Sequence, residues 1–336
     1  MEVVGVGIAT IDVIHDVAAY PQEDSKVRAL SAKKRRGGNV SNALVVCSQL
    51  GATCRWMGTT TDPKRDGDAA FVYDDLNKYA VDMSLASVVV SGAMPVSYIL
   101  SSRATGSRTI IHHRDLPELS FDSFRELLGC LSPINLPRWF HFEGRNLGNV
   151  ALMMQYVRTH SPSSMISVEI EALRNEWEDT RRLGALADVV FVSKDYIREK
   201  LQLSNANAFF QSVIGMQCPE SRPIVWICPW GSTGVYFMDR TQCDHIPTAS
   251  LDVVHDSVGA GDSFIGATIA ALAYDVPLVD ALRMACRVAT TKCTIEGFEL
   301  PKELILEAQL MLQNVKPKLK LVSKPEEVRS VSLTAM

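Results

Sequence analysis

The sequence predicts a three-layer α/β fold in which helices cover both faces of a mainly parallel sheet. Short segments rich in β-branched and aromatic residues alternate with segments whose apolar residues recur at helical spacing, as in repeated β-α-β units. The chain has 336 residues and 47% hydrophobic content, enough to bury a full core. Such sheets bind ligands at the carboxyl ends of their strands, so we expect the functional site at that edge.

The elements follow in chain order from these patterns. The expected strands are residues 3–9, 54–59, 139–142, 166–169, 189–192 and 224–228. The expected helices are residues 39–50, 66–79, 147–158, 175–186, 263–274 and 278–293. We assign residues 1–300 to this domain and residues 301–336 to a C-terminal helix, with Leu304, Ala308, Met311 and Leu312 on one face, followed beyond Pro317 by a disordered tail.

Two stretches, residues 14–35 and 88–113, are strand-like and have no helix between their strands. We interpret them as a small β lid that projects from the main sheet. An ordinary meander at the sheet edge explains the pattern equally well.

The composition argues against several classes of partner. The formal net charge of −4 gives no reason to expect nucleic acid or an anionic membrane. No apolar run approaches the ~20 residues of a membrane-spanning helix, and the first residues lack the basic flank of a signal peptide, so a cytoplasmic protein is expected. The eight cysteines lack C-x-x-C spacing and are interpreted as reduced thiols.

A glycine-rich loop, Gly259-Ala260-Gly261-Asp262, opens an apolar helical segment. Glycines let backbone N–H groups close on an anion, and the helix N-terminus adds partial positive charge. An acid in such a loop would repel phosphate, but it is suited to take a proton from an attacking hydroxyl. We therefore predict that Asp262 is a general base and that the amides of residues 259–261 form an anion hole. In isolation, an ordinary glycine turn before a helix is the commoner explanation.

A second cluster lies near the N-terminus, where Gly38 precedes a predicted helix. Asn39 and Asn42 are three residues apart in its first turn, so they share a face, and amides can both donate to and accept from sugar hydroxyls. Asp12 and Asp24 lie upstream. Each acid alone is typical of a strand end or a turn, but together with the amides they predict a sugar site.

Other polar groups follow the expected strands. Glu143, Arg145 and Asn146 follow one strand and Lys194 and Asp195 another. Glu169 and Glu171, two apart in a predicted strand, would face the same way and could contact hydrated magnesium, although two solvated carboxylates are commoner. The basic run of residues 33–36 is expected to be a solvated strand face that secondarily attracts an anionic nucleotide.

These two glycine-containing motifs, residues 37–42 and 256–262, together resemble those of the ribokinase (PfkB) superfamily of carbohydrate kinases. Residues 20–25, 106–110, 142–146, 191–195, 292–293 and 297–298 narrow the resemblance to the branch that phosphorylates fructose at the 1-hydroxyl. The resemblance covers about residues 3–298 and implies a ribokinase-like fold.

This resemblance also implies a set of ligands and residue roles. ATP would lie against Gly231, Ser232, Thr233 and Gly234, with its phosphates at Gly259, Ala260, Gly261 and Arg108. Mg²⁺ would be held mainly by the ATP phosphates. Potassium beside the Asp256 loop is possible, although Ser257 stands where threonine is more usual. The lid would form a homodimer contact. Open alternatives are another kinase of this superfamily, acting on ribose, a nucleoside or the 6-hydroxyl of a hexose, and a catalytically silent sugar-binding protein.

Overall fold

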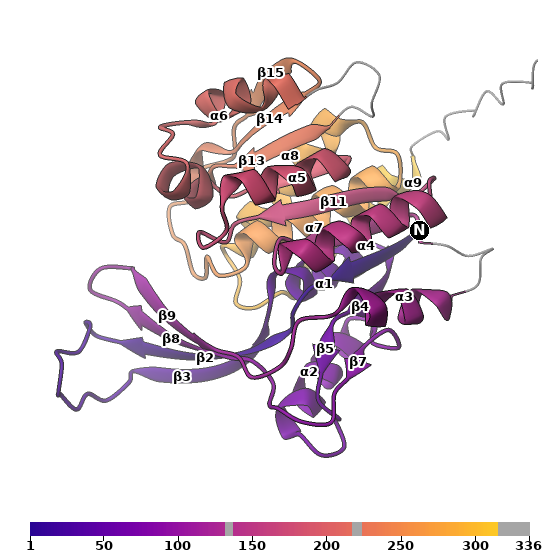
Figure 1. The fold of residues 1–336 in the computed structure, drawn as a ribbon. Coiled ribbons are helices and arrows are strands. Elements are labelled where there is room, and N and C mark those ends of the chain that lie inside the picture. Colours follow the sequence, from indigo (N-terminus) through magenta and orange to yellow (C-terminus); the bar gives the residue numbers. More distant parts are fainter. Residues whose placement is uncertain (132–136, 217–223, 315–336) are drawn as a thin grey trace, which may run out of the picture.

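A large twisted sheet forms the centre of the computed structural model, which describes residues 1–131, 137–216 and 224–314 (Figure 1). Within these ranges, nine strands pair in the order β15-β14-β13-β12-β11-β10-β1-β4-β6. They are β1 (Glu2–Val6), β4 (Thr53–Met57), β6 (Val81–Asp82), β10 (Trp139–Glu143), β11 (Met165–Ile170), β12 (Val189–Val192), β13 (Val225–Pro229), β14 (Val235–Asp239) and β15 (Gln242–Ile246). Only the β13–β14 and β14–β15 pairs in this described sheet are antiparallel, so the predicted mainly parallel sheet is confirmed.

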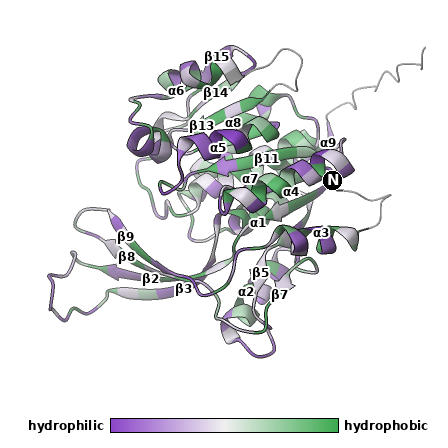
Figure 2. Ribbon diagram, in the orientation of Figure 1, coloured by the Kyte–Doolittle hydropathy of each residue, from purple (hydrophilic) through white to green (hydrophobic). Residues whose placement is uncertain are grey.

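Helices cover both faces of this sheet, as predicted (Figures 1 and 2). One layer contains α1 (Asn39–Gln49), α2 (Gly67–Lys78), α7 (Ala260–Ala273), α8 (Leu278–Lys292) and α9 (Lys302–Gln313). The other contains α3 (Phe121–Gly129), α4 (Leu147–His160), α5 (Trp177–Leu186) and α6 (Ala206–Val213). Short turns of helix, η2 (Tyr196–Lys200), η3 (Ile214–Met216) and η4 (Gly231–Thr233), complete the described elements.

The central strands are apolar on both faces because each layer of helices has its own hydrophobic core. Along β10, Trp139 packs into the core of α1 and α7, whereas Phe140 and Phe142 pack into the core of α3 and α4. Along β12, Val189 packs into the first of these cores and Val190 into the second. Successive side chains of a strand point to opposite faces, so a continuous apolar run is typical of a strand buried on both sides.

A second, smaller sheet projects from the main body (Figure 1). Its described strands pair in the order β3-β2-β8-β9, from β2 (Thr10–Val17), β3 (Ser31–Gly37), β8 (Val96–Ser102) and β9 (Arg108–His113). A separate two-stranded sheet is formed by β5 (Thr59–Thr60) and β7 (Ser87–Val88), which lie between β3 and β8 in the chain. The two stretches that the sequence analysis predicted to be strand-like therefore form a separate sheet. They are not a meander at the edge of the large sheet.

The first core strand is shorter than predicted. It ends at Val6, because the N–H of Ile8 bonds the Glu143 carboxylate at 2.9 Å and the chain turns away into β2. The small sheet consequently begins at Thr10, earlier than the predicted residue 14, and includes Asp12.

Several other expectations concern the ends of the chain and the cysteines. Leu304, Ala308 and Leu312 of α9 are buried, as expected, whereas the expected tail at residues 315–336 lies outside the described residues. The seven described cysteines are all free, and Cys218 lies outside the described ranges. Among the helices that the structure describes, none combines the length and apolar character needed to cross a membrane.

Close packing of α1 against α7 brings the two glycine motifs together. A Cβ atom at Gly266 would lie 2.2 Å from the carbonyl oxygen of Ala43, so only glycine permits this helix–helix distance. Gly266 is therefore a structural requirement of the site, although no ligand atom need approach it.

We expect Gly266→Ala to lower the free energy of unfolding by about 1–3 kcal/mol, because an added methyl group overpacks a buried contact. Gly148→Ala is the matched control: it also lies in a helix, α4, but its Cβ position has no neighbour within 4 Å. Replacing a helical glycine there gains about 0.5–1 kcal/mol. Urea titration of both variants measures the difference, and equal effects at the two positions would contradict the packing argument.

Candidate active site

The candidate site lies where the order of the large sheet reverses. From β1 the chain places β4 and β6 on one side and β10 to β13 on the other, so the carboxyl ends of β1 and β10 flank the point of reversal. Open α/β sheets bind ligands in the crevice at this point. Here Glu143 ends β10, and its Oε2 atom accepts the bond from the N–H of Ile8 after β1.

Gly38 shapes the start of α1. Its φ is 99°, and a Cβ atom would lie 2.3 Å from the carbonyl oxygen of Ile8, so a side chain is excluded by both conformation and space. Ser41 fixes the same turn by donating its hydroxyl hydrogen bond toward the carbonyls of Gly37 and Gly38, at 2.8 and 2.9 Å. The first turn of α1 therefore presents its polar side chains to the crevice in a fixed orientation.

Both predicted amides lie beside carboxylates. Asn42 Nδ2 donates to Asp262 Oδ2 at 2.7 Å, and Asn39 Nδ2 donates to Glu169 Oε2 at 3.2 Å. Asp12 lies on the neighbouring strand β2, and its carboxylate occupies the space that a Cβ atom of Gly37 would fill, at 2.3 Å. The structure therefore brings the two predicted glycine motifs together, with Asp12 beside the first of them.

Burial and mutual repulsion perturb these carboxylates. Burial, together with the charges of Glu171 and Asp12, raises the pKa of Asp262 to about 7, against the lowering effect of the Asn42 bond and of Arg36. Burial also raises the pKa of Asp12, and burial with Glu171, Asp262 and Glu143 nearby raises the pKa of Glu169 well above its usual range. A carboxyl group that titrates near neutral pH is matched to proton transfer.

The loop before α7 has the geometry of an anion site. Gly259 adopts φ 79°, and its Cα faces the Phe298 ring, whose nearest atom lies 2.2 Å from an added Cβ position. Among the described residues, the N–H groups of Gly261 and Asp262 have no acceptor, whereas the N–H of Ala260 bonds Ser257 O at 3.3 Å. A Cβ atom on Gly261 would meet open space, so the two free amides lie at an uncovered helix N-terminus, where an anion is favoured.

Asp256, at the start of this loop, is held by two cations. Lys292 Nζ lies 2.9 Å from Asp256 Oδ2 and donates to its carbonyl oxygen at 3.0 Å, and Arg35 contacts the same carboxylate at 2.6 Å. Burial opposes ionisation of Asp256, but these bonds outweigh it and lower its pKa. A potassium ion at this carboxylate would face two fixed positive charges, so these atoms do not fit one.

The expectation of a solvated basic strand was wrong for Arg35 and Arg36. Lys33 and Lys34 have side-chain exposures of 38% and 43%, but Arg36 has 1%, and its guanidinium pairs with Asp75 at 2.7 Å. The strand enters the core just before Gly37, and alternation alone cannot show where that happens. Arg36 is a residue of the site that sequence reasoning missed. Its position directly before the glycine pair that opens a buried helix is the available signal.

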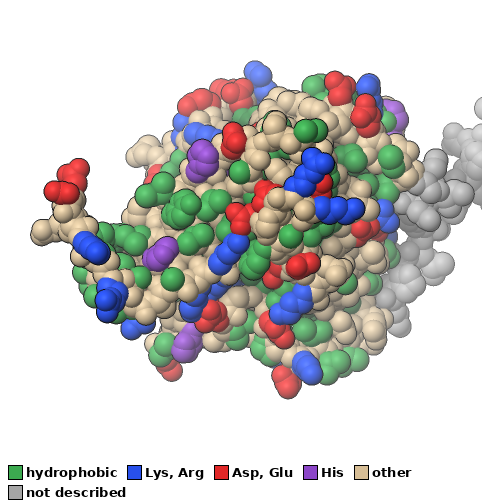
Figure 3. All heavy atoms as spheres, turned by 90° about the horizontal axis from the view of Figure 1, so that it is seen from below, with side chains coloured by type: hydrophobic (Ala, Val, Ile, Leu, Met, Phe, Trp, Pro, Cys, Tyr) green, Lys and Arg blue, Asp and Glu red, His purple; other side chains and the backbone are tan. Residues whose placement is uncertain are grey.

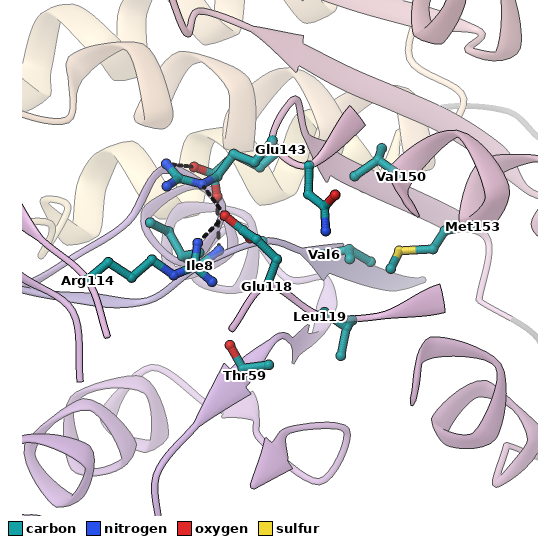
Figure 4. Close-up of a pocket in the computed structure, with 12 residues that line it drawn as sticks. Val6, Ile8, Thr59, Arg114, Glu118, Leu119, Glu143, Val150 and Met153 are labelled. Carbon is teal, nitrogen blue, oxygen red and sulfur yellow. Dashed lines mark hydrogen bonds and ion pairs between the residues drawn. The ribbon is translucent and has the colours of Figure 1, made fainter. Parts of the chain in front are cut away.

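A chain of ion pairs closes the other side of the crevice (Figure 4). Arg145 pairs with Glu143 at 3.5 Å and with Glu118 at 3.3 Å, and Glu118 also pairs with Arg114, directly after β9. Burial raises the pKa of Glu143 to about 7, although Arg145 and the Ile8 amide lower it. The strand-end residues Glu143 and Arg145 therefore connect the small sheet to the core.

Other predicted residues are placed as follows. Gly231 to Gly234 form the turn after β13, in which residues 231–233 are exposed and the buried Gly234 has φ 105°. Lys194 and Asp195 follow β12, and Asn146 begins α4. The interpretation of Glu169 and Glu171 as one strand pair was wrong, because β11 ends at Ile170 and Glu171 is exposed beyond it.

Two predicted residues do not join this cluster within the single chain. Asp24 is exposed in the loop between β2 and β3, with φ 57°, at the far end of the small sheet. Arg108 is exposed where β9 begins, and its side chain makes no hydrogen bond or ion pair with another described residue. The register places Arg108 opposite Ser101, which lies opposite Asp16, so Arg108 shares the face of Asp12 but lies four residues farther out.

Comparisons with known proteins identify the family to which the chain belongs. The family model described as pfkB family carbohydrate kinase matches residues 1–303. The chain is 32% identical over 306 residues to ketohexokinase of Mus musculus, an alignment that covers 89% of this chain and 98% of the mouse protein.

Solved structures with this fold include ribokinases. A putative ribokinase from Agrobacterium tumefaciens has a TM-score of 0.76 at 18% identity, covering 94% of this chain and 99% of its own. The ribokinase of Arabidopsis thaliana, in a structure with ribose and ATP, has a TM-score of 0.75 at 15% identity, covering 91% and 98%. The ribokinase-like fold predicted from the sequence is confirmed.

The raised pKa of Asp262 predicts a pH-dependent effect on stability. Because the folded pKa of about 7 exceeds the usual value of 3.8, the stabilising contribution is full below that usual value and is lost as pH rises through 7. We expect Asp262→Asn to be more stable than the wild type by about 1–3 kcal/mol at pH 8 and to lose this advantage toward pH 4. Thermal unfolding across this range measures it; a pH-independent difference would mean that Asp262 titrates normally.

Proposed function

We propose that this chain, which belongs to the pfkB family of carbohydrate kinases, transfers the γ-phosphoryl group of ATP to the 1-hydroxyl of D-fructose. The observation that carries the proposal is the Asp262 carboxylate, which Asn42 holds at 2.7 Å in the first turn of α7 beside free backbone amides. The preference for a ketohexose rests on the similarity to ketohexokinase over most of the chain.

In this proposal, Asp262 takes the proton of the attacking sugar hydroxyl. Asn39, Asn42 and Asp12 provide hydrogen bonds to the other hydroxyls, and Gly38, whose backbone packs against the Ile8 carbonyl, contacts the sugar through its main chain. Because the base must be ionised, kcat/KM for the sugar rises with pH through about 7.

The nucleotide half of the site would lie along the same edge of the sheet. The turn Gly231, Ser232, Thr233 and Gly234 would contact the base and ribose, and the loop Gly259, Ala260 and Gly261 would hold the transferred phosphoryl group. Mg²⁺ carried by ATP would neutralise phosphate charge when bound. Burial, together with the negative charges of Glu171, Asp262 and Glu143, raises the pKa of Glu169, and a hydrated divalent cation beside Glu169 and Glu171 would offset this negative charge.

The small sheet would act as a lid and as a homodimer contact. Tyr98 and Ile111 are paired across β8 and β9, so they lie on one face, and they are 51% and 67% exposed. Figure 3 views the molecule from below, and hydrophobic side chains lie among Lys and Arg side chains on the extension at its left. A pair of such faces from two copies would bury this surface. In the assembled dimer, Asp24 would be positioned at the sugar site.

We place the enzyme in the cytoplasm.

A substrate panel tests the proposed reaction. Purified protein with magnesium-ATP is incubated with fructose, ribose, a nucleoside and glucose, and ³¹P–¹H NMR identifies the phosphorylated hydroxyl. We expect turnover with fructose and a product substituted at the 1-hydroxyl. Preference for ribose or a nucleoside, or a 6-phosphate product, would replace the substrate assignment, and the absence of sugar-stimulated ATP turnover would favour a silent sugar-binding protein.

The general base has its own test. Asp262→Asn keeps the size and hydrogen-bonding capacity of the side chain but cannot accept the proton, so we expect kcat to fall by about 10²–10⁴ with little change in sugar binding. Asp280→Asn is the matched control, since Asp280 is also in the first turn of a helix, α8, on the surface. Near-normal turnover in Asp262→Asn would place the base elsewhere.

Closure of the lid predicts a different kinetic effect. Arg108 would reach the phosphates only in a closed state, so Arg108→Ala should lower kcat about 10-fold or more while fructose KM changes less. Arg103→Ala, in the exposed turn of the same hairpin, is the control.

Light scattering measures the oligomeric state of the wild-type protein. A fully active monomer at micromolar concentration would contradict the proposed dimer.

A further inference from the structure

We propose that Arg36 is a positioning residue of the kinase, which fixes the Asn42 side chain so that its NH₂ group faces the Asp262 carboxylate. This inference rests on the proposed role of Asp262 as the base. It concerns a buried arginine that no step of the reaction uses directly. Arg36 would act through its neighbour, without touching the sugar or ATP.

The guanidinium of Arg36 is held on several sides. Its Nε pairs with Asp75 Oδ2 of α2 at 2.7 Å, and its Nη1 donates to Ser41 Oγ at 2.8 Å and to Asn42 Oδ1 at 2.6 Å. The residue is 4% exposed, and Asn42 is 5% exposed. A planar fork held in this way has little freedom to move.

The chemistry of the donor decides which way the Asn42 amide faces. Arginine has donors and no acceptor, so the amide must turn its oxygen toward Arg36. Its NH₂ group then necessarily faces Asp262, where it donates at 2.7 Å. A carboxylate accepts such a bond in its ionised form, which is the form a general base needs.

Without Arg36, the Asn42 amide would lose the donor that fixes which way its oxygen faces. A rotated amide would present its oxygen to Asp262, and two oxygen acceptors can share a hydrogen bond only if the carboxyl is protonated. Reversal of one buried amide would therefore convert a base ready to accept a proton into an acid that already has one.

Arg36 also contacts the phosphate half of the site. Its guanidinium carbon lies 5.6 Å from the centroid of the Phe298 ring, and that ring packs directly against Gly259. Arg36 thus contacts Asn42 in the sugar half and Phe298, the ring that packs against the loop before α7.

The charges facing Asp262 come from several elements. Glu171 lies after β11 and Glu169 within it, Asp12 lies on β2, and Arg36 lies on β3. Of these, only Arg36 carries a positive charge, and no other cation is among the principal influences on Asp262. Removing it leaves the carboxylate among like charges, so the amide and the charge act in the same direction.

The experiment is the pH profile of kcat/KM for the sugar in Arg36→Met, in Arg36→Lys and in the control Lys34→Met. Lys34 lies two residues earlier on the same face of β3, pairs with Asp68 of α2 at 2.6 Å and stacks on Phe71, but it is exposed. We expect the acidic limb to move up by about one pH unit in Arg36→Met and to stay near wild type in Arg36→Lys and Lys34→Met, because lysine keeps a donor-only cation. A merely structural role would lower activity without moving the limb.

A double variant separates the route through Asn42 from general damage. In an Asn42→Ala background, Arg36→Met should move the limb by less than half as much as it does alone. An equal shift in both backgrounds would overturn the positioning role. If Arg36→Met does not fold, Arg36→Gln serves instead, because a glutamine amide can donate or accept and no longer dictates how Asn42 turns.

The outcomes distinguish the two proposals. A limb unmoved in both Arg36→Met and Arg36→Gln overturns the role of Arg36, even if Asp262→Asn is inactive. Full activity of Asp262→Asn overturns the base itself, whatever Arg36 does.

Discussion

The hydrogen bond between Asn42 and Asp262 is the constraint on which the site depends. It joins Asn42 in the first turn of α1 to Asp262 in the first turn of α7, 220 residues apart in the sequence. Because hydrogen-bond distances vary by only about half an ångström, the two helices must keep their relative positions. Gly266 permits that approach, and Gly38 aims the first turn of α1. The glycines near the two motifs therefore set the distance at which a base and its orienting amide can meet.

The same arrangement is costly to the folded state. Asp262, Glu143 and Glu169 all have raised pKa values, because burial and mutual repulsion disfavour their ionised forms. A protein selected only for stability would replace such groups, whereas a phosphotransferase benefits from a base near neutral pH and from negative charge that a nucleotide-bound cation can offset. The site is thus a local departure from the stable packing of the surrounding strands.

Sequence reasoning succeeded where a pattern is local. The β-α alternation predicted the sheet and both layers of helices, and the first turn of α1 predicted that Asn39 and Asn42 share a face. It failed where tertiary structure decides. Arg36 reads as one of four basic residues in a strand, and only the packing of α1, α2 and Phe298 around it shows that it is buried. Glu171 was misplaced because a strand end depends on its neighbours in the sheet.

The separation of Asn42 from Asp262 along the chain also affects the order in which the protein can become functional. Contacts between distant segments form late, since the loop that they close carries a large entropic cost. During synthesis, α1 emerges long before α7, which lies in the last quarter of the described chain. The apolar face of α1 therefore remains uncovered until α7 has been made. Until α7 docks, the nascent domain exposes this face, and binding by chaperones would be strongest in that interval.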